Sequence, residues 1–370
     1  MNVLITGADG FIGKNLVVHL QEQQGVVIDT YTRNDDIASL PGKVARAEFV
    51  FHLAGINRPQ DPQEFTTGNV DLTRALADAV RATGRTIPLL YTSSTQAALD
   101  NVYGASKRGA EEVLADLAQA TGSPVYLLRL PNVFGKWARP NYNSAVATFC
   151  HNIARDLPIQ INDRDAHISL VYIDDVVRCF LDVMRGEHAG KDSVEVQPKY
   201  SVSVGEIADH LQAFKTTRDS LITERVGTGF LRALYSTYVS YLPEDRFTYE
   251  VPKHGDERGV FVEMLKTHDS GQFSYFTAHP GITRGGHYHH TKTEKFLVIK
   301  GTANFRFRHM VTGEFYELQT CGDKPVIVET VPGWTHDITN IGDDEMVVML
   351  WANEIFDRAL PDTYAKPLTA

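Results

Sequence analysis

Short apolar runs alternate with longer amphipathic segments through the first part of the chain. The apolar runs have the length of buried strands, and the longer segments repeat apolar positions at helical spacing. Strands that alternate with helices predict βαβ units and a parallel, doubly wound sheet. The predicted strands are Val3–Ile5, Val26–Tyr31, Phe49–Leu53, Pro88–Ser93 and Val125–Leu130. The predicted helices include Gly13–Gln24, Val70–Thr83 and Ser106–Thr121.

The pattern changes from Tyr249 onward, where Gly and Pro punctuate short strand-like runs. Many short strands with turn signals predict an all-β sandwich or barrel. A polar stretch, Pro243–Pro252, separates the two patterns. We therefore predict two domains, residues 1–245 and residues 246–370. The predicted strands of the second domain are Phe261–Leu265, Gln272–Thr277, Glu294–Ile299, Ala303–Arg308, Pro325–Glu329 and Met346–Trp351.

Composition narrows the class of protein. The chain has 370 residues, of which 43% are apolar, enough for two folded domains. Its net charge of −10 and the lack of a basic run argue against nucleic acid or an anionic membrane surface as a partner. The start, Met1–Gly7, has the pattern of a strand and not of a signal peptide, and the three cysteines are far apart. We expect a cytoplasmic protein with no membrane span.

The first predicted strand runs into Thr6-Gly-Ala-Asp-Gly-Phe-Ile-Gly13, which opens the first helix. A first Gly permits a tight turn, a second lets the backbone approach a pyrophosphate, and a third allows close helix–strand packing. The helix N-terminus then faces the anion. This pattern predicts a dinucleotide site formed by Gly7, Gly10, Phe11, Ile12 and Gly13.

The residue after the second strand selects the cofactor. An acidic residue there would bind a ribose 2′-hydroxyl, but the strand ends at Tyr31-Thr-Arg33. An Arg suits the 2′-phosphate of NADP. We therefore favour NADP(H) over NAD; the alternative is that Arg33 is a solvated surface residue.

Ser94, Tyr103 and Lys107 form a candidate hydride-transfer site. Tyr103 and Lys107 stand at i and i+4, one above the other on a helix face. Hydride delivery to a ketone creates an alkoxide that needs a proton, and a cation beside a Tyr lowers its pKa. Lys107 is placed to do this for Tyr103, while Ser94 can hold the carbonyl oxygen.

These motifs resemble the extended short-chain dehydrogenases/reductases from Met1 to about Tyr241. The resemblance implies a Rossmann-like fold, cofactor contacts from Tyr103 and Lys107 as well as the Gly loop, and a place for Asn132 between nicotinamide and sugar nucleotide. The further matching segments are His52-Leu53-Ala54-Gly55 (Leu53, Ala54 and Gly55 being expected cofactor contacts), Asn69, Arg129-Leu-Pro-Asn132-Val-Phe-Gly135 and Val171-Tyr-Ile-Asp-Asp175.

The C-terminal part contains a candidate metal site. Its segments fit G-x5-H-x-H-x4-E-x6-G, from Gly281 to Gly301, and G-x2-H-x3-N, from Gly333 to Asn340. Two His residues that alternate along a strand point to the same face. Three imidazoles and a carboxylate suit Zn, Fe, Ni or Mn. The predicted ligands are His287, His289, Glu294 and His336.

The same region resembles the cupin-type epimerases of deoxysugar nucleotides, through Asp256-Glu-Arg-Gly-Val-Phe-Val-Glu263 and Gly281-Ile-Thr-Arg-Gly-Gly-His287. The resemblance implies that Arg258 and Arg284 hold nucleotide phosphates; the alternative for each is a surface salt bridge. In that family the base is the residue at the position of His287. A His cannot readily be both metal ligand and base, so His290 is our candidate base, with Tyr288 and Asp337 as alternatives.

Arg306 and Arg308 alternate with Phe305 and Phe307 along one strand. One pair must face the interior of the barrel. We expect a core of Phe with exposed Arg; an Arg-lined diphosphate pocket is the alternative.

The order of the two parts resembles the CapF-type family of bifunctional capsule and O-antigen enzymes. This resemblance implies a cytoplasmic homodimer that binds zinc and uses NADPH. The cupin would epimerise C3 of UDP-2-acetamido-2,6-dideoxy-β-L-arabino-4-hexulose, a UDP-4-keto-6-deoxy amino sugar. The reductase would then reduce the C4 ketone to give UDP-2-acetamido-2,6-dideoxy-β-L-talose, a precursor of UDP-N-acetyl-L-fucosamine. The segments that carry the match are Gly135–Ser144, Leu234–Pro243, His289–Lys292, Asn353–Asp357 and Pro361–Tyr364.

Two other functions are kept open. In the first, the reductase acts on another 4-keto-6-deoxy nucleotide sugar while the cupin only dimerises the chain and binds metal structurally. In the second, the chain senses nucleotides without catalysis; the intact set of Ser94, Tyr103 and Lys107 argues against this.

Overall fold

The structure is a computed structural model that describes all residues except 62, 191–193, 252–253, 257–258, 262–264, 268–270, 355–358 and 369–370. The chain forms two compact units. Unit 1 comprises Met1–Ser144 and Ile168–Ser201, and unit 2 comprises Ala145–His167 and Val202–Ala370.

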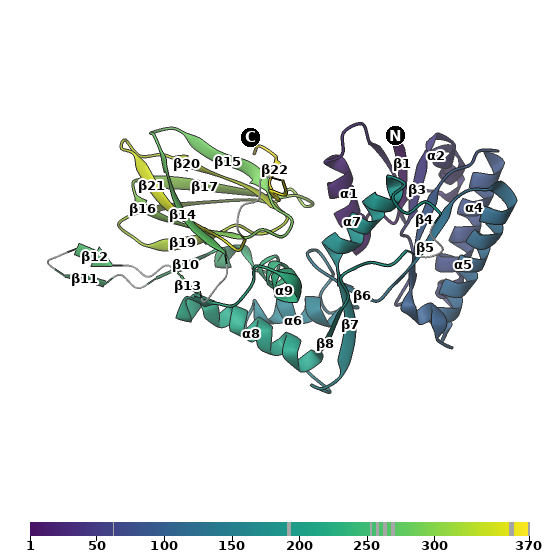
Figure 1. Ribbon diagram of the computed structural model, residues 1–370, viewed down its shortest axis with the longest axis horizontal. Coiled ribbons are helices and arrows are strands. Elements are labelled where there is room, and N and C mark those ends of the chain that lie inside the picture. Colours follow the sequence, from purple (N-terminus) through teal and green to yellow (C-terminus); the bar gives the residue numbers. More distant parts are fainter. Residues whose placement is uncertain are drawn as a thin grey trace. The chain divides into compact units, whose positions relative to one another are not determined.

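Unit 1 is built on a parallel five-stranded sheet with the order β2-β1-β3-β4-β5. Helices α1 and α7 cover one face, and α2, α4 and α5 cover the other (Figure 1). This is the doubly wound arrangement that the alternating pattern predicts. The bounds are β1 Asn2–Thr6, α1 Phe11–Gln21, β2 Val27–Tyr31, α2 Leu40–Arg46, β3 Phe49–His52, α4 Leu72–Ala82, β4 Leu89–Ser94, α5 Val102–Thr121, β5 Val125–Leu130 and α7 Ile173–Met184.

The core of unit 1 follows from the strand alternation. Val50 on β3 packs into the cluster that α2, α4 and α5 cover, together with Leu76 and Leu114. Its neighbour Phe51 points to the opposite face, where its ring stacks on that of Phe180 in α7 at 5.9 Å. Both faces are therefore buried, which explains why these strands are apolar throughout.

Shorter elements connect the main ones in unit 1. A π-helical turn precedes α4, and strands β6 and β7 pair in parallel within a separate three-stranded sheet of order β6-β7-β8. Their bounds are η1 Ile37–Ser39, α3 Gln63–Phe65, η2 Thr66–Asp71, η3 Thr95–Ala98, β6 Asn132–Phe134, β7 His167–Tyr172 and β8 Tyr200–Ser203.

Unit 2 contains two antiparallel five-stranded sheets that form the all-β sandwich of a cupin-like domain (Figure 1). The first has the order β10-β19-β16-β21-β14, and the second β18-β17-β20-β15-β22. Between them Phe296 and Phe305 pack with ring centroids 5.7 Å apart. The bounds are β10 Thr248–Glu250, β14 Gln272–Ala278, β15 Thr283–Tyr288, β16 Glu294–Lys300, β17 Thr302–His309, β18 Phe315–Cys321, β19 Val326–Glu329, β20 Trp334–Asn340, β21 Met346–Ala352 and β22 Tyr364–Ala365.

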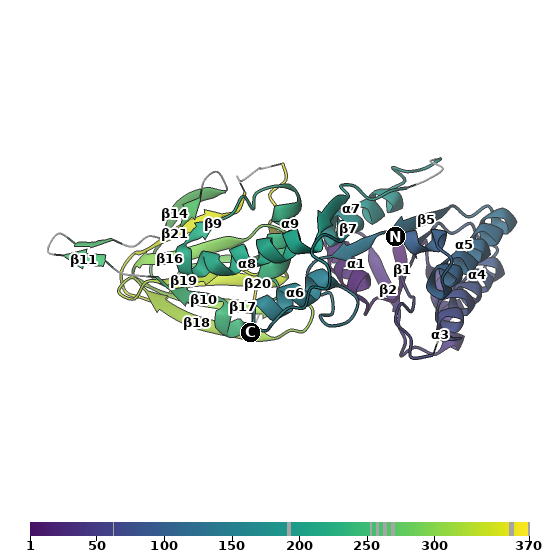
Figure 2. The ribbon, with the colours of Figure 1, turned by 90° about the horizontal axis from the view of Figure 1, so that it is seen from below.

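Three helices belong to unit 2 and pack against one another beside its sheets (Figure 2). Glu329 on β19 accepts hydrogen bonds from Arg218 of α8 and from Lys295 of β16; Glu329 and Lys295 are buried and Arg218 is partly exposed. Burial raises the pKa of Glu329, but the two cations more than offset this and lower it. The helices are α6 Ala145–Ile153, α8 Val204–Ser220 and α9 Gly229–Val239; the remaining elements are β9 Ile222–Thr223, η4 Glu244–Arg246, β11 His254–Asp256, β12 Gly259–Phe261 and β13 Lys266–Thr267.

Packing therefore divides the chain differently from the predicted sequence domains 1–245 and 246–370, because residues 145–167 and 202–245 join the β-sandwich unit. The predicted boundary near residue 245 marks a change of sequence pattern, and as a domain boundary it stays a prediction.

The predicted fold class is confirmed, with differences at particular elements. Helix α5 begins at Val102, four residues before the predicted start, because the side chain of Asn101 caps it by accepting from the Gly104 amide at 2.7 Å. Strands β18 and β20 were not predicted. The strand expected to carry both His287 and His289 is β15, but it ends at Tyr288, so His289 lies in the loop that follows. The predicted strand Phe261–Leu265 lies largely outside the described residues. Among the helices that the structure describes, none combines the length and apolarity needed to cross a bilayer.

Candidate functional site

The Gly loop of unit 1 lies at the carboxyl end of β1, between the neighbouring strands β2 and β3. Gly7 has a φ of +73°, and a Cβ on it would stand 2.7 Å from the Ala54 Cα. A Cβ on Gly13 would stand 2.3 Å from the Gly7 carbonyl oxygen, so α1 packs onto the turn only with glycine here. Gly10 caps α1 without a side-chain hydrogen bond. The helix N-terminus is thus open to an anion, which fits the pyrophosphate of a dinucleotide.

Arg33 is exposed and follows β2 directly. The acidic residues after it serve local turns. The Asp35 carboxylate accepts from the Thr32 amide at 2.8 Å and from the Thr32 hydroxyl at 2.9 Å. Asp36 accepts from the Ala38 amide at 3.0 Å. Arg33 is thus the exposed cation of this turn, beside the exposed Asp36.

The sheet holds Lys107 rigidly. Its Nζ donates to the Thr92 carbonyl at 2.9 Å and to the Tyr91 hydroxyl at 3.2 Å, and the side chain is buried. Burial lowers the pKa of Lys107 to about 8, although Glu111 acts in the opposite direction. The amine therefore remains largely protonated at neutral pH.

Tyr103 lies one helical turn before Lys107, on the same face of α5. Burial raises the pKa of its hydroxyl, and a hydrogen bond with Ser94 lowers it by less, so the pKa lies above its ordinary value and not below it as predicted from Lys107. A Cβ on Gly55 would stand 3.2 Å from Lys107 Nζ, so the loop after β3 passes directly beside the amine. The structure thus brings Ser94, Tyr103, Lys107 and Gly55 together at the carboxyl ends of β3 and β4.

Two buried polar side chains fix this loop. Asn69 accepts from the Ile56 amide at 2.7 Å and donates to the Ile56 carbonyl at 3.0 Å, and it also donates to Ser106 at 2.9 Å. His52 bridges the hydroxyls of Thr6 at 2.6 Å and Thr73 at 2.8 Å. Burial lowers the pKa of His52 to about 3, so this ring stays neutral and structural.

Asn132 is exposed at the start of β6, and its amide donates to the Ser169 carbonyl at 3.3 Å. Its place between nicotinamide and sugar stays a prediction. Tyr91 was not predicted as part of the site. Its ring lies under Lys107 Nζ at 4.8 Å from the centroid, a contact that sequence spacing does not reveal.

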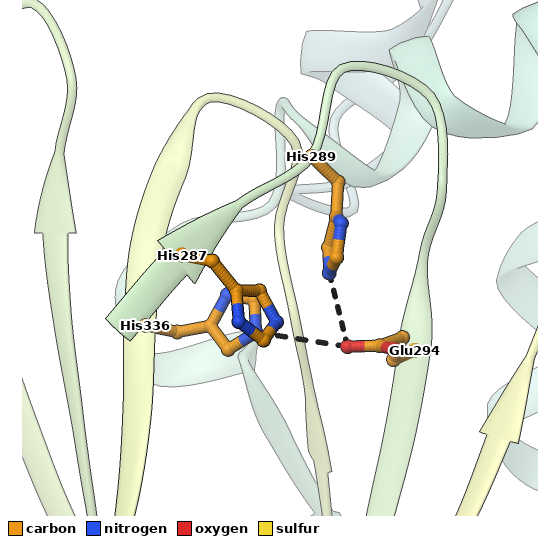
Figure 3. A group of neighbouring side chains, drawn as sticks. All are labelled: His287, His289, Glu294 and His336. Atoms are coloured by element: carbon orange, nitrogen blue, oxygen red, sulfur yellow. Dashed lines mark hydrogen bonds and ion pairs between the residues drawn. The ribbon is translucent and has the colours of Figure 1, made fainter. Parts of the chain in front are cut away.

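The four predicted metal ligands converge in unit 2 (Figure 3). Each of His287, His289, Glu294 and His336 offers one ligand atom, and these atoms lie within 4.8 Å of one another. The register explains this convergence. His287 on β15 pairs with His336 on β20, so both side chains share a face of the sheet. Glu294 begins β16 in the opposite sheet.

The donor atoms of this cluster fit a cation. His289 Nε2 lies 3.1 Å from Glu294 Oε2, and His336 Nε2 lies 3.6 Å from the same oxygen. Neither ring nitrogen of His336 has a hydrogen-bond partner within the described part of the chain. Buried lone pairs that face one another are unfavourable unless a positive charge joins them. Three imidazoles and a carboxylate in this arrangement suit Zn²⁺.

The electrostatics of the cluster agree with this. Burial and the neighbouring His336 and His289 rings lower the pKa of His287 to about 3. Burial raises the pKa of Glu294, but His289 and His336 more than offset it and hold the pKa well below its usual range. The site therefore presents neutral imidazole and ionised carboxylate, the protonation states that bind metal.

The alternative proton acceptors lie away from the ligand atoms. Asp337 forms a two-point ion pair with Arg306, at 2.9 and 2.6 Å, on the face of β20 opposite His336. Tyr288 stacks on Tyr364 with centroids 5.6 Å apart. His290 is buried, with its ring 4.9 Å from that of Tyr364 and outside the ligand cluster. Its role as the base stays a prediction.

The structure describes only one of the two candidate phosphate ligands. Arg258 lies outside the described residues. Arg284 is exposed and lies over the Phe276 ring, 5.4 Å from its centroid. It pairs with Ile338, two residues beyond His336 on β20, so it shares the face that carries the metal ligands. Phe305 and Phe307 are buried while Arg306 is part-exposed, which confirms the Phe core.

Together, a doubly wound dinucleotide fold with a Ser–Tyr–Lys set and a β-sandwich with a metal-ligand cluster define a nicotinamide-dependent oxidoreductase joined to a cupin. The chain belongs to the NAD dependent epimerase/dehydratase family, whose model matches residues 3–196. A second model, the polysaccharide biosynthesis C-terminal domain, matches residues 254–364.

Known proteins resemble the whole chain. A UDP-2-acetamido-2,6-beta-L-arabino-hexul-4-ose reductase of Pseudomonas aeruginosa is 64% identical over 99% of this chain and 98% of its own. The crystal structure of the capsular polysaccharide assembling protein CapF of Staphylococcus aureus is 42% identical, with a TM-score of 0.70 and full coverage of both chains. UDP-glucuronic acid 4-epimerase of Bacillus cereus, 20% identical with a TM-score of 0.52, covers 58% of this chain and 84% of its own, and shares the fold.

Proposed function

We propose that this protein is a cytoplasmic, homodimeric enzyme that carries out two consecutive reactions on one UDP-linked 4-keto-6-deoxy amino sugar. The cupin epimerises C3 of UDP-2-acetamido-2,6-dideoxy-β-L-arabino-4-hexulose, and the reductase converts the C4 ketone to the alcohol with NADPH. The product is UDP-2-acetamido-2,6-dideoxy-β-L-talose. The observation that carries the proposal is that one chain holds both a Tyr103–Lys107 pair and a convergent metal-ligand cluster.

The chemistry of the substrate links the two sites. A C4 ketone acidifies the neighbouring C3–H, so a base can remove that proton and a proton can return on the other face. When bound, NADPH supplies the hydride for C4, and Tyr103 gives its hydroxyl proton to the developing alkoxide. Lys107, held by Thr92 and Tyr91, stabilises the tyrosinate that remains. Ser94 is placed to hold the ketone oxygen.

Zn²⁺ held by His287, His289, Glu294 and His336 would polarise the ketone and so acidify C3–H. Arg284, on the same face of the sheet, is placed to bind the diphosphate. His290 remains our candidate for the proton transfer. The function assigned by name to the Pseudomonas relative supports the sugar and the ketone position for this chain.

A narrower function is favoured by that relative's name, which specifies a reductase alone. Under it, the cupin has a structural role and the ketone is reduced without change at C3. Both functions predict that NADPH is consumed with the UDP-4-keto-6-deoxy amino sugar, made in situ by a dehydratase and followed by the absorbance of NADPH. The absence of consumption by a folded protein that binds NADPH would contradict both.

Replacement of Arg33 by Ser should raise the KM for NADPH about tenfold, the equivalent of about 1.4 kcal/mol, and leave the KM for NADH unchanged. The reason is that Arg33 is the exposed cation at the end of β2, where the 2′-phosphate lies in dinucleotide folds. Steady-state kinetics with both cofactors measure this. Arg74→Ser, which removes another exposed Arg of unit 1, serves as the control. An equal rise in the KM for NADPH and for NADH would show that Arg33 does not bind the 2′-phosphate.

A further inference from the structure

The segment before β22 makes a dense set of hydrogen bonds to the loop that carries a metal ligand. The Asp362 carboxylate accepts from the backbone amides of His290, Thr291 and Lys292, at 3.0, 2.8 and 2.6 Å. It also accepts from the Thr291 hydroxyl at 2.9 Å. These three residues directly follow His289, so one carboxylate fixes the course of the backbone immediately after the ligand.

The main chain of the same residue contacts the ligand itself. The Asp362 carbonyl oxygen lies 2.6 Å from His289 Nδ1. A carbonyl oxygen can only accept, so Nδ1 carries the proton and Nε2 carries the lone pair. It is Nε2 that faces Glu294 Oε2, at 3.1 Å. The contact with Asp362 therefore sets both the tautomer and the direction of the metal-binding nitrogen.

The backbone of Asp362 has a φ of +39°, a conformation that L-residues other than Asn and Asp rarely adopt. The carboxylate bonds to residues 290–292 hold it in this conformation, which in turn aims its carbonyl at His289. Burial raises the pKa of Asp362, but the nearby His290 and His289 and the backbone amides more than offset this and lower it.

The residues after Asp362 extend this contact to the other ligand strands. In β22, Ala365 pairs with His287 of β15. The Lys366 carbonyl accepts from the Thr335 hydroxyl at 2.5 Å, next to His336 on β20. The C-terminal segment thus touches the backbone or side chain at or beside all three His ligands.

We propose that Asp362 is a positioning residue of the metal centre: it fixes the Nε2 tautomer and the orientation of His289 through its carbonyl and anchors the 290–292 loop through its carboxylate. This proposal rests on the proposed metal centre. In other proteins, hydrogen bonds between a metal-ligating His and a residue outside the coordination shell contribute about 10- to 100-fold to metal affinity.

The test compares zinc affinity of the full chain, Asp362→Asn and Asp362→Ala by competition with a chromogenic chelator. Asn keeps the volume of Asp and tolerates the same φ. Its NH₂ group, however, cannot accept a hydrogen bond from the backbone amides that the Asp362 carboxylate binds. We expect Asp362→Asn to bind zinc about 10- to 100-fold more weakly and to change the visible absorption of the Co²⁺-loaded protein. NADPH binding, assigned to unit 1 by the proposed function, should be unchanged, and a circular dichroism spectrum equal to that of the unaltered chain shows that unit 2 is folded.

Thr363→Val is the matched control, because the Thr363 hydroxyl bonds Lys292 Nζ at 2.7 Å and no bond of Asp362 depends on it. It should keep the zinc affinity within about a factor of two of the unaltered chain. The proposal is wrong if both Asp362 variants keep the zinc affinity and Co²⁺ spectrum of the unaltered chain, or if Thr363→Val loses as much affinity. If the unaltered chain itself binds no zinc, the metal centre of the proposed function fails as well.

Discussion

Replacing Tyr103 with Phe should lower the rate of NADPH oxidation by about 10³-fold while leaving the affinity for NADPH unchanged. Only the hydroxyl proton is lost, and burial together with the Ser94 hydrogen bond show that this hydroxyl is held inside the site. The rate is measured by NADPH absorbance, and the cofactor affinity by fluorescence titration. The same variant should still exchange C3–H, because proton exchange belongs to unit 2.

Tyr126→Phe provides the control for the Tyr103 variant, since it removes a hydroxyl from β5 of the same unit, and its neighbours Val125 and Leu127 are the residues that pack on the α5 side. It should retain the activity of the unaltered protein. Two results would count against the assignment of Tyr103 as the proton donor. One is retention of more than about a tenth of the activity by Tyr103→Phe. The other is a loss of NADPH affinity large enough to account for the fall in rate.

Replacing His336 with Ala should weaken zinc binding by about 10²- to 10³-fold and abolish exchange at C3. Zinc sites of four protein ligands release about 10–16 kcal/mol on binding, so one ligand accounts for about 3–4 kcal/mol of it. Metal content after dialysis and hydrogen exchange at C3, followed by NMR, measure the two effects. Reduction of a ketone that needs no epimerisation should continue, because Tyr103 and Lys107 lie in unit 1.

His279→Ala is the matched control for the His336 variant, because it removes an exposed His of the same unit from outside the ligand cluster. It should keep both zinc and exchange. If His336→Ala loses zinc and yet exchanges C3–H at the original rate, the metal is structural and takes no part in the exchange. If it keeps its zinc, the assignment of the cluster as the metal site is wrong.

The parts of the two sites that could be predicted from the sequence are those whose residues lie close together in the chain. The Gly loop, the Tyr103–Lys107 pair and the H-x-H ligands each depend on residues a few positions apart. The helical period places Tyr103 and Lys107 on one face of α5, whereas His289 lies in the loop after β15 and not on the strand. Apart from its histidines, strand β15 escaped prediction. Its inward positions hold Arg284 and His287, so it lacks the apolar alternation of a core strand.

The contacts that sequence could not predict join residues far apart in the chain. Asp362 contacts the loop after His289 although 70 residues separate it from Lys292 in the sequence. Nothing in the local sequence pattern marks Asp362 as a partner of a metal ligand. Helix α8 contacts the β-sandwich through Arg218, which donates to Glu329 across 111 positions. Tyr91 similarly supports Lys107 from a buried strand whose residues read as ordinary core.

The most direct test of the central claim, that one chain both epimerises C3 and reduces C4, is a single turnover assay in deuterated water. The UDP-4-keto-6-deoxy amino sugar is incubated with the zinc-loaded protein and NADPH, and the product is examined by NMR. The account predicts consumption of NADPH, deuterium at C3 and a talo-configured product, with exchange at C3 persisting when NADPH is omitted. A reduced product with hydrogen at C3 and the starting configuration would contradict it.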